Sequence, residues 1–165
     1  MDTLVKKAQQ GDAEAFIALI EECRATLRRV AYGYLGNEED AADAIQDTIL
    51  AAYEHLHALK KEKHFKTWLV RILVNNCTKT WRQNKRETEF AAYRDTDLEA
   101  VDYGRARVEF RELLRSLPED SRTIFQLYYG EQFTTREIAL ILGIRENTVK
   151  SRLHRGREKL REELK

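Results

Sequence analysis

Residues 134–160 read TTREIALILGIRENTVKSRLHRGREKL, and this stretch predicts two helices joined by a tight turn. Thr134 can cap the first helix, and Glu137, three residues later, completes a capping box. Gly143 falls where the turn needs a residue that tolerates a positive φ. Apolar residues recur at helical spacing on both sides of this glycine. The stretch therefore predicts a helix-turn-helix.

The second of these helices has a polar face opposite its apolar stripe. Amide, hydroxyl, imidazole and basic side chains on such a face can bond base edges and phosphates in a DNA major groove. An amphipathic hairpin with a solvated basic face is the alternative, and the glycine turn favours DNA binding. The candidate DNA contacts on this face are Asn147, Lys150, Ser151, His154 and Arg155.

The composition predicts an all-α fold. Of 165 residues, 35% are charged and 42% hydrophobic, and seven Gly and one Pro leave few interruptions. No stretch approaches the ~20 apolar residues that a membrane span requires. The first 12 residues lack the apolar core of a signal peptide. We therefore expect a cytoplasmic protein that does not insert into a membrane.

Charge is distributed unevenly along the chain and predicts two domains. Residues 1–83 have 12 basic and 12 acidic residues, whereas residues 105–165 have 14 basic against 10 acidic. Between them, residues 84–104 have three basic and six acidic residues and no helical apolar periodicity. That composition is typical of a solvated, flexible linker. We expect two small helical domains, 1–86 and 105–165, joined by an acidic linker at 87–104.

The N-terminal domain has an acidic helix face. Asp12 can cap a helix to about Tyr34, Gly36 can end it, and Asn37 can cap the next. In that next helix four carboxylates share one face, where each like-charged pair costs a few tenths of a kcal/mol. Either the face is an ordinary solvated one or it meets a basic partner. The four are Asp40, Asp43, Asp47 and Glu54.

A further helix, at about residues 65–84, has a basic stripe. Its members follow one another at close to every fourth position: Arg71, Asn75, Lys79, Arg82 and Arg86. The loop before it is also basic and includes Lys63. Aromatic side chains beside basic ones suit single-stranded nucleic acid, where stacking contributes ~1–3 kcal/mol per base. Trp68 is such an aromatic, although a tryptophan at this spacing is more often part of a core.

No group of residues resembles a catalytic or metal site. Cys23 and Cys77 are far apart in sequence and have no CxxC partner, so we expect reduced, part-buried thiols. His55 and His57 lie two apart, which on a helix places them on different faces. A thiol or metal enzyme is therefore the weakest of the alternatives, and we expect neither cofactor nor metal.

Three segments together resemble the extracytoplasmic-function (ECF) sigma factors of bacterial RNA polymerase. DAADAIQDTILAAYEHL, from Asp40, is similar to the helix with which sigma factors bind the polymerase clamp. FKTWLVRILVNNCTKTWR, from Phe65, is similar to the helix that opens and recognises the −10 element. The segment from Leu117 to Leu164 resembles the domain that binds the −35 element. The order of the three motifs is highly specific.

The resemblance implies a role for particular residues. Asp43, Gln46 and Asp47 match the clamp-binding motif, with Asp47 in place of the usual Glu. Asn75 matches the position that lines a pocket for a flipped −10 base, and Lys79 stands where Asp is frequent. Together, the resemblance and the basic stripe give these candidate contacts to the −10 element: Lys63, Trp68, Asn75, Lys79 and Arg82. Arg145 replaces the common Ser or Pro and joins the −35 contacts as a phosphate ligand.

The resemblance also implies partners. They are the core RNA polymerase, promoter DNA (duplex at −35 and single-stranded at −10), and an anti-sigma factor, often a membrane-anchored one. A stand-alone helix-turn-helix regulator is the main alternative. Such a regulator would need its own dimer interface or sensor pocket, and the first 83 residues are better explained as polymerase-binding and strand-binding faces.

Overall fold

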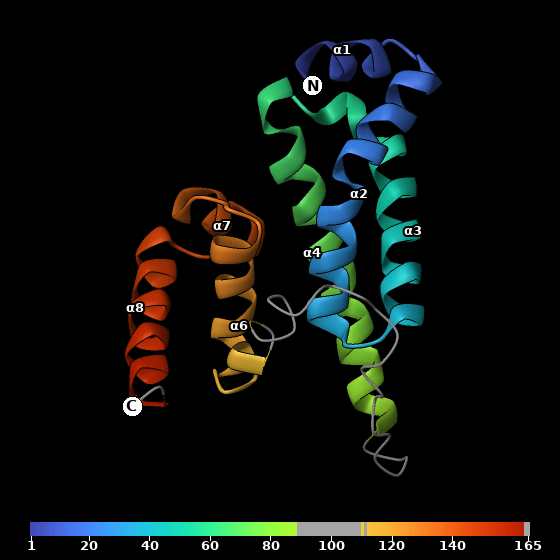
Figure 1. The fold of residues 1–165 in the computed structure, drawn as a ribbon. Helices are drawn as coiled ribbons and strands as arrows, with labels where there is room; N and C mark the ends of the chain where they lie inside the picture. The colour runs from blue at the N-terminus through green and yellow to red at the C-terminus, as the bar shows by residue number, and fades with distance from the viewer. Residues whose placement is uncertain (89–109, 111, 164–165) are drawn as a thin grey trace. The chain divides into compact units, whose positions relative to one another are not determined.

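The chain divides into two compact units, Met1–Thr96 and Asp97–Lys165. The computed structural model describes residues 1–88, 110 and 112–163 (Figure 1). All regular elements in these residues are helical, as the composition predicted. The predicted linker at 87–104 begins inside a helix that runs to Thr88, and its remaining residues lie outside the described ones.

The first unit is a bundle of three long helices closed at one end by a short one. The long helices are α2 (Ala13–Leu35), α3 (Glu38–His55) and α4 (Phe65–Thr88), and each packs against the other two. The short helix α1 (Asp2–Gln9) lies across the end of the bundle (Figure 1). Two 3-10 turns, η1 (Leu56–Ala58) and η2 (Glu62–His64), connect α3 to α4 at that end.

Capping side chains fix where these helices begin. The carboxylate of Asp12 accepts a hydrogen bond from the amide of Ala15 at 3.1 Å, and the Asn37 side chain accepts one from the amide of Asp40 at 2.8 Å. Gly36 ends α2 at φ 78°, in the left-handed region that favours glycine. These three predictions from the sequence are confirmed.

Helix α1 has no counterpart in the sequence prediction. The side-chain amide of Gln9 donates hydrogen bonds from Nε2 to the backbone carbonyls of Leu56 and Leu59, at 3.1 and 2.9 Å. Val5 is the buried residue of α1 and is 0% exposed. Because Leu56 and Leu59 are about 50 residues away in the chain, local periodicity could not reveal what stabilises this helix.

The second unit contains the predicted helix-turn-helix. Its elements are α6 (Glu119–Phe125), the π-helical turn η3 (Gln126–Gly130), α7 (Thr135–Leu142) and α8 (Glu146–Glu163). The Thr134 hydroxyl accepts from the amide of Glu137 at 3.1 Å, and the Glu137 carboxylate accepts from the amide of Thr134 at 3.0 Å. Gly143 has φ 67°. The capping box and the glycine turn are both confirmed.

Helices α6 and α8 pack closely against each other in the core of this unit. Ile138, Ile141, Val149 and Leu153 are buried between α7, α8 and the preceding helix. A Cβ added at Gly156 would lie 2.4 Å from the ring of Phe125, whose side chain is 2% exposed. Glycine at this position therefore allows the two helices to approach closely.

Candidate functional site

The centre of the acidic face of α3 is exposed and forms no ion pair with any residue that the structure describes. Asp43, Gln46 and Asp47 are exposed, whereas Ala44 and Thr48, on the opposite side of the helix, are buried. Within the described residues, neither Asp43 nor Asp47 forms a salt bridge. No described residue therefore offsets the repulsion between these carboxylates, which leaves both available to a basic partner.

Asp40 differs from the other carboxylates that were predicted to share this face. It is half-buried, and one of its carboxylate oxygens accepts hydrogen bonds from the side-chain amides of Asn37 and Asn84, each at 2.7 Å. Its charge is thereby engaged in holding the end of α4 against the start of α3. Asp40 belongs to the packing of the bundle, and the exposed acidic face begins at Asp43.

The basic stripe of α4 is confirmed as an exposed surface. Arg71, Asn75, Lys79, Arg82 and Arg86 are all exposed along one side of the helix, and Lys63 is exposed in η2. Trp68 lies beside the stripe and is half-buried, with its ring centroid 6.0 Å from that of Phe65. Part of the indole therefore remains open to a ligand while the rest belongs to the core.

Polar contacts on the inner side of α4 set the direction in which this stripe faces. Asn76 donates to the hydroxyl of the buried Thr48 at 3.0 Å, and Thr48 in turn donates to the carbonyl of Ala44 at 2.7 Å. Tyr34 and Thr78 share a hydrogen bond of 3.0 Å. Because these bonds fix the rotation of α4 about its axis, the neighbouring Asn75 is held outward.

The polar face of α8 is exposed in full, as the pattern predicted. Its members are Asn147, Lys150, Ser151, His154 and Arg155, and Arg145, which directly precedes the helix, is exposed as well. The carbonyl of Arg145 accepts from the amides of Thr148 and Val149, so this residue begins the helix while its side chain stays in solvent.

The first turn of α8 is tied to α7 by Glu146. Its carboxylate accepts a hydrogen bond from Thr135 at 2.9 Å and lies 3.7 Å from the ammonium of Lys150. The ammonium of Lys150 is more than half exposed, so the pair is weak. Lys150 can therefore exchange this partner for a phosphate at little cost.

A cluster beside this face escaped the sequence analysis. Arg157 donates a hydrogen bond from Nε to the hydroxyl of Tyr129 at 2.7 Å, and its guanidinium lies over the rings of Tyr128 and Tyr129. This hydrogen bond raises the pKa of Arg157. In the sequence, the only hint of this cluster is the pair of neighbouring tyrosines at 128 and 129. Only the fold brings Tyr129 to Arg157, which is 28 positions later.

The two cysteines are buried, free thiols. Both are free and at most 1% exposed, so they are more deeply buried than the predicted part-buried thiols. Burial raises the pKa of Cys23 and raises that of Cys77 to about 12. In the part of the chain that the structure describes, no three His, Cys, Asp or Glu side chains group as a metal site, and no helix could span a membrane.

Two family models match the chain, one in each unit. Residues 19–87 match Sigma-70 region 2, and residues 107–160 match Sigma-70 region 4. These segments include α3 and all but the last residue of α4 in the first unit, and α7 with most of α8 in the second.

Curated relatives and solved structures agree with these matches. The chain is 30% identical to the RNA polymerase sigma factor SigV of Bacillus subtilis, over 96% of both chains. It is 33% identical to the ECF RNA polymerase sigma factor EcfG of Rhodopseudomonas palustris, over 82% of this chain and 77% of that one. Its structure is similar to the sigma factor RpoE of Bartonella quintana in complex with the anti-sigma factor NepR, with a TM-score of 0.78, 26% identity, and coverage of 92% and 98%.

Proposed function

The chain belongs to the ECF sigma factors of bacterial RNA polymerase, and we propose how its three exposed faces divide the work of promoter-specific transcription initiation. A sigma factor is a regulatory subunit, so polymerisation is left to the core enzyme. In this proposal one face binds the core, and the other two bind promoter DNA in different states. The observation that supports the division is that the acidic face of α3, the basic stripe of α4 and the polar face of α8 are all exposed.

The acidic face of α3 binds the clamp of core polymerase in this scheme. The support is that Asp43, Gln46 and Asp47 are exposed and that the two carboxylates have no ion-pair partner among the described residues. A basic surface on the clamp would relieve their mutual repulsion. Truncating one side of a desolvated charge pair at an interface typically costs 2–5 kcal/mol, so this contact can dominate core affinity.

The stripe of α4 binds the single-stranded −10 element. Lys79 and Arg82 can neutralise phosphates, the exposed part of Trp68 can stack on a base, and Asn75 can bond the edge of an extruded base. Lys63 extends the same charge into η2. Because Asn76 fixes the inner side of α4, Asn75 is held on the outer side of the helix.

The polar face of α8 binds the duplex −35 element in the major groove. Asn147, Ser151 and His154 can bond base edges, whereas Arg145, Lys150 and Arg155 can bond phosphates or guanine. The domain boundaries of 1–86 and 105–165 with a linker at 87–104 remain our proposal for how the two DNA-binding domains are joined.

We further propose that an anti-sigma factor holds the protein inactive in the cytoplasm. The support is that RpoE of Bartonella quintana is in complex with the anti-sigma factor NepR, and that CnrH is in complex with the cytosolic domain of CnrY. CnrH is 26% identical to this chain, over 99% of this chain and 96% of CnrH, with a TM-score of 0.74. A membrane-anchored anti-sigma factor would release the protein on a signal from outside the cell.

Holoenzyme binding to two DNA probes tests the assignment of the two helices. Asn75→Ala should weaken discrimination at one −10 base by ~1–3 kcal/mol, and a pre-melted bubble should not restore the preference. Lys150→Ala and Arg155→Ala should instead weaken binding to a duplex −35 probe. If Asn75→Ala impaired only −35 binding and the α8 variants changed only −10 preference, the two assignments would be reversed.

A further inference from the structure

Arg157 is held in a fixed position by two aromatic rings. The Tyr128 and Tyr129 rings pack edge to face with centroids 4.9 Å apart, and the guanidinium lies 5.8 and 5.7 Å from their centroids. The Tyr129 ring is itself anchored to the core, because its centroid lies 5.4 Å from that of the buried Phe125. The Nε donor of Arg157 is used by the Tyr129 hydroxyl, which leaves the four N–H groups of the guanidinium terminus for another acceptor.

Among the residues that the structure describes, no carboxylate neutralises the charge of Arg157. Three other cations of α8 each have a carboxylate partner: Lys150 pairs with Glu146, Arg152 with Asp120 and Arg161 with Glu158. Within the ranges that the structure describes, Arg157 contacts tyrosines and no carboxylate. A guanidinium that is ordered but has no counter-charge is prepared to bind an anion with little loss of side-chain entropy.

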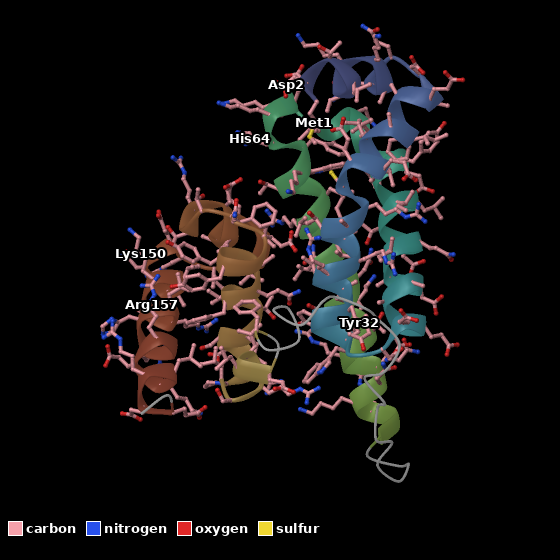
Figure 2. The ribbon with its side chains drawn as sticks, in the orientation of Figure 1. Met1, Asp2, Tyr32, His64, Lys150 and Arg157 are labelled. Carbon is pink, nitrogen blue, oxygen red and sulfur yellow. The ribbon has the colours of Figure 1, made fainter. Side chains whose placement is uncertain are left out.

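Arg157 also lies on the side of α8 that carries Lys150, one of the proposed DNA contacts. It follows Lys150 by seven residues, close to two helical turns, so both residues lie on one side of the helix, about 10 Å apart along its axis. Figure 2 labels both residues on α8. Tyr129 is 46% exposed, and its hydroxyl accepts from Arg157 while its own hydrogen remains free to donate.

We propose that Arg157 and Tyr129 form a binding site for one phosphate of the promoter backbone beside the −35 element. The guanidinium terminus and the Tyr129 hydroxyl would both donate to the same phosphodiester, one turn of α8 beyond His154. The inference rests on the proposed function of α8, to which it adds a contact that fixes the register of the helix along the duplex and recognises no base.

Holoenzyme binding to a duplex −35 probe across a salt series tests this site. Arg157→Ala should lower affinity on the order of tenfold, since a hydrogen bond to a charged group is lost. It should also flatten the plot of log affinity against log salt by about 0.9, the value for one phosphate contact. Preference for the −35 sequence over a scrambled probe should not change. Arg157→Lys should keep the slope but lose affinity, and Tyr129→Phe should lose a few-fold in affinity at unchanged slope.

Arg161→Ala is the matched control, because it removes a positive charge one turn further along α8 that Glu158 already neutralises. Equal changes in slope for Arg157→Ala and Arg161→Ala would overturn the proposal, since net charge alone would then explain them. An unchanged slope in Arg157→Ala, with wild-type −35 preference intact, would overturn the site and leave the proposed function standing. A wild-type holoenzyme with no −35 preference would overturn both. Circular dichroism of each variant should match wild type.

Discussion

Gly156→Ala should destabilise the second unit although alanine is the better helix former. The added Cβ would lie 2.4 and 2.7 Å from two ring carbons of Phe125, well inside ordinary van der Waals contact. Phe125 is only 2% exposed, so its ring cannot turn aside into solvent. Overpacking a core typically lowers the free energy of unfolding by 1–3 kcal/mol, and contacts this short place the cost near the upper end of that range. The higher helix propensity of alanine offsets about 1 kcal/mol of this cost. We therefore expect the free energy of unfolding of the second unit to fall by about 2 kcal/mol.

The two units can be followed separately in one experiment. Both tryptophans, Trp68 and Trp81, are in the first unit, so their fluorescence reports its unfolding alone. Circular dichroism at 222 nm reports both units. A loss of 2 kcal/mol in a unit of this size lowers its Tm by roughly 8–16 °C. We expect the Gly156→Ala protein to show this shift by circular dichroism, with an unchanged tryptophan transition.

A double variant identifies Phe125 as the obstacle. Leucine is smaller and more flexible than phenylalanine, so Phe125→Leu should make room for a Cβ at position 156. The double variant should be more stable than the sum of the single changes predicts, by at least 1 kcal/mol. If Gly156→Ala were as stable as wild type, or if the two changes were simply additive, close packing of α6 on α8 would not be the reason for glycine here.

Three further predictions concern other parts of the chain. Thr134→Ala should cost about 1 kcal/mol in the second unit, because the capping box is lost; circular dichroism melts would show it, and no change would mean that the box adds nothing. The double variant Asp43→Lys with Asp47→Lys should no longer co-purify with core polymerase, while its helicity stays unchanged. The control Glu21→Lys with Glu22→Lys changes the charge equally on α2 and should still co-purify. Equal core binding by the two double variants would show that the acidic face of α3 does not bind the clamp. Cys77 should resist iodoacetamide at pH 8.5 in the native state and react in denaturant. Burial raises the pKa of Cys77 to about 12, so the thiol ionises at a lower pH in the unfolded chain than in the folded one. The contribution of this group to the free energy of unfolding should therefore fall as pH rises from about 9 towards 12. Alkylation of the native protein as fast as in denaturant would contradict this prediction.

Local signals predicted the helix ends and the exposed faces well. Asp12, Asn37 and Thr134 each precede an apolar periodic run, and the capping bonds they make involve residues three positions away. Such bonds depend only on neighbouring sequence. The exposure of Asn75 and Arg155 likewise follows from helical periodicity, because the opposite side of each helix is apolar.

Contacts between distant residues could not be predicted in this way. Asp40 looks like a member of the acidic face until Asn84, 44 residues later, is seen to bond it. Arg157 looks like one more basic residue of α8 until the fold brings Tyr129 to its Nε atom. In both cases a long-range hydrogen bond decides which partners the charged side chain can bind. The periodicity of the sequence does not reveal such a bond.

Run-off transcription with purified core polymerase tests the central claim most directly. Core enzyme plus this protein should produce a transcript from a template with a matched −10 and −35 element, and the product should disappear when either element is scrambled. The variant with Asp43→Lys and Asp47→Lys should give none, although its DNA-binding faces are intact. Binding of the protein alone to promoter DNA, with no core-dependent transcript from any template, would contradict the account and indicate a stand-alone helix-turn-helix regulator.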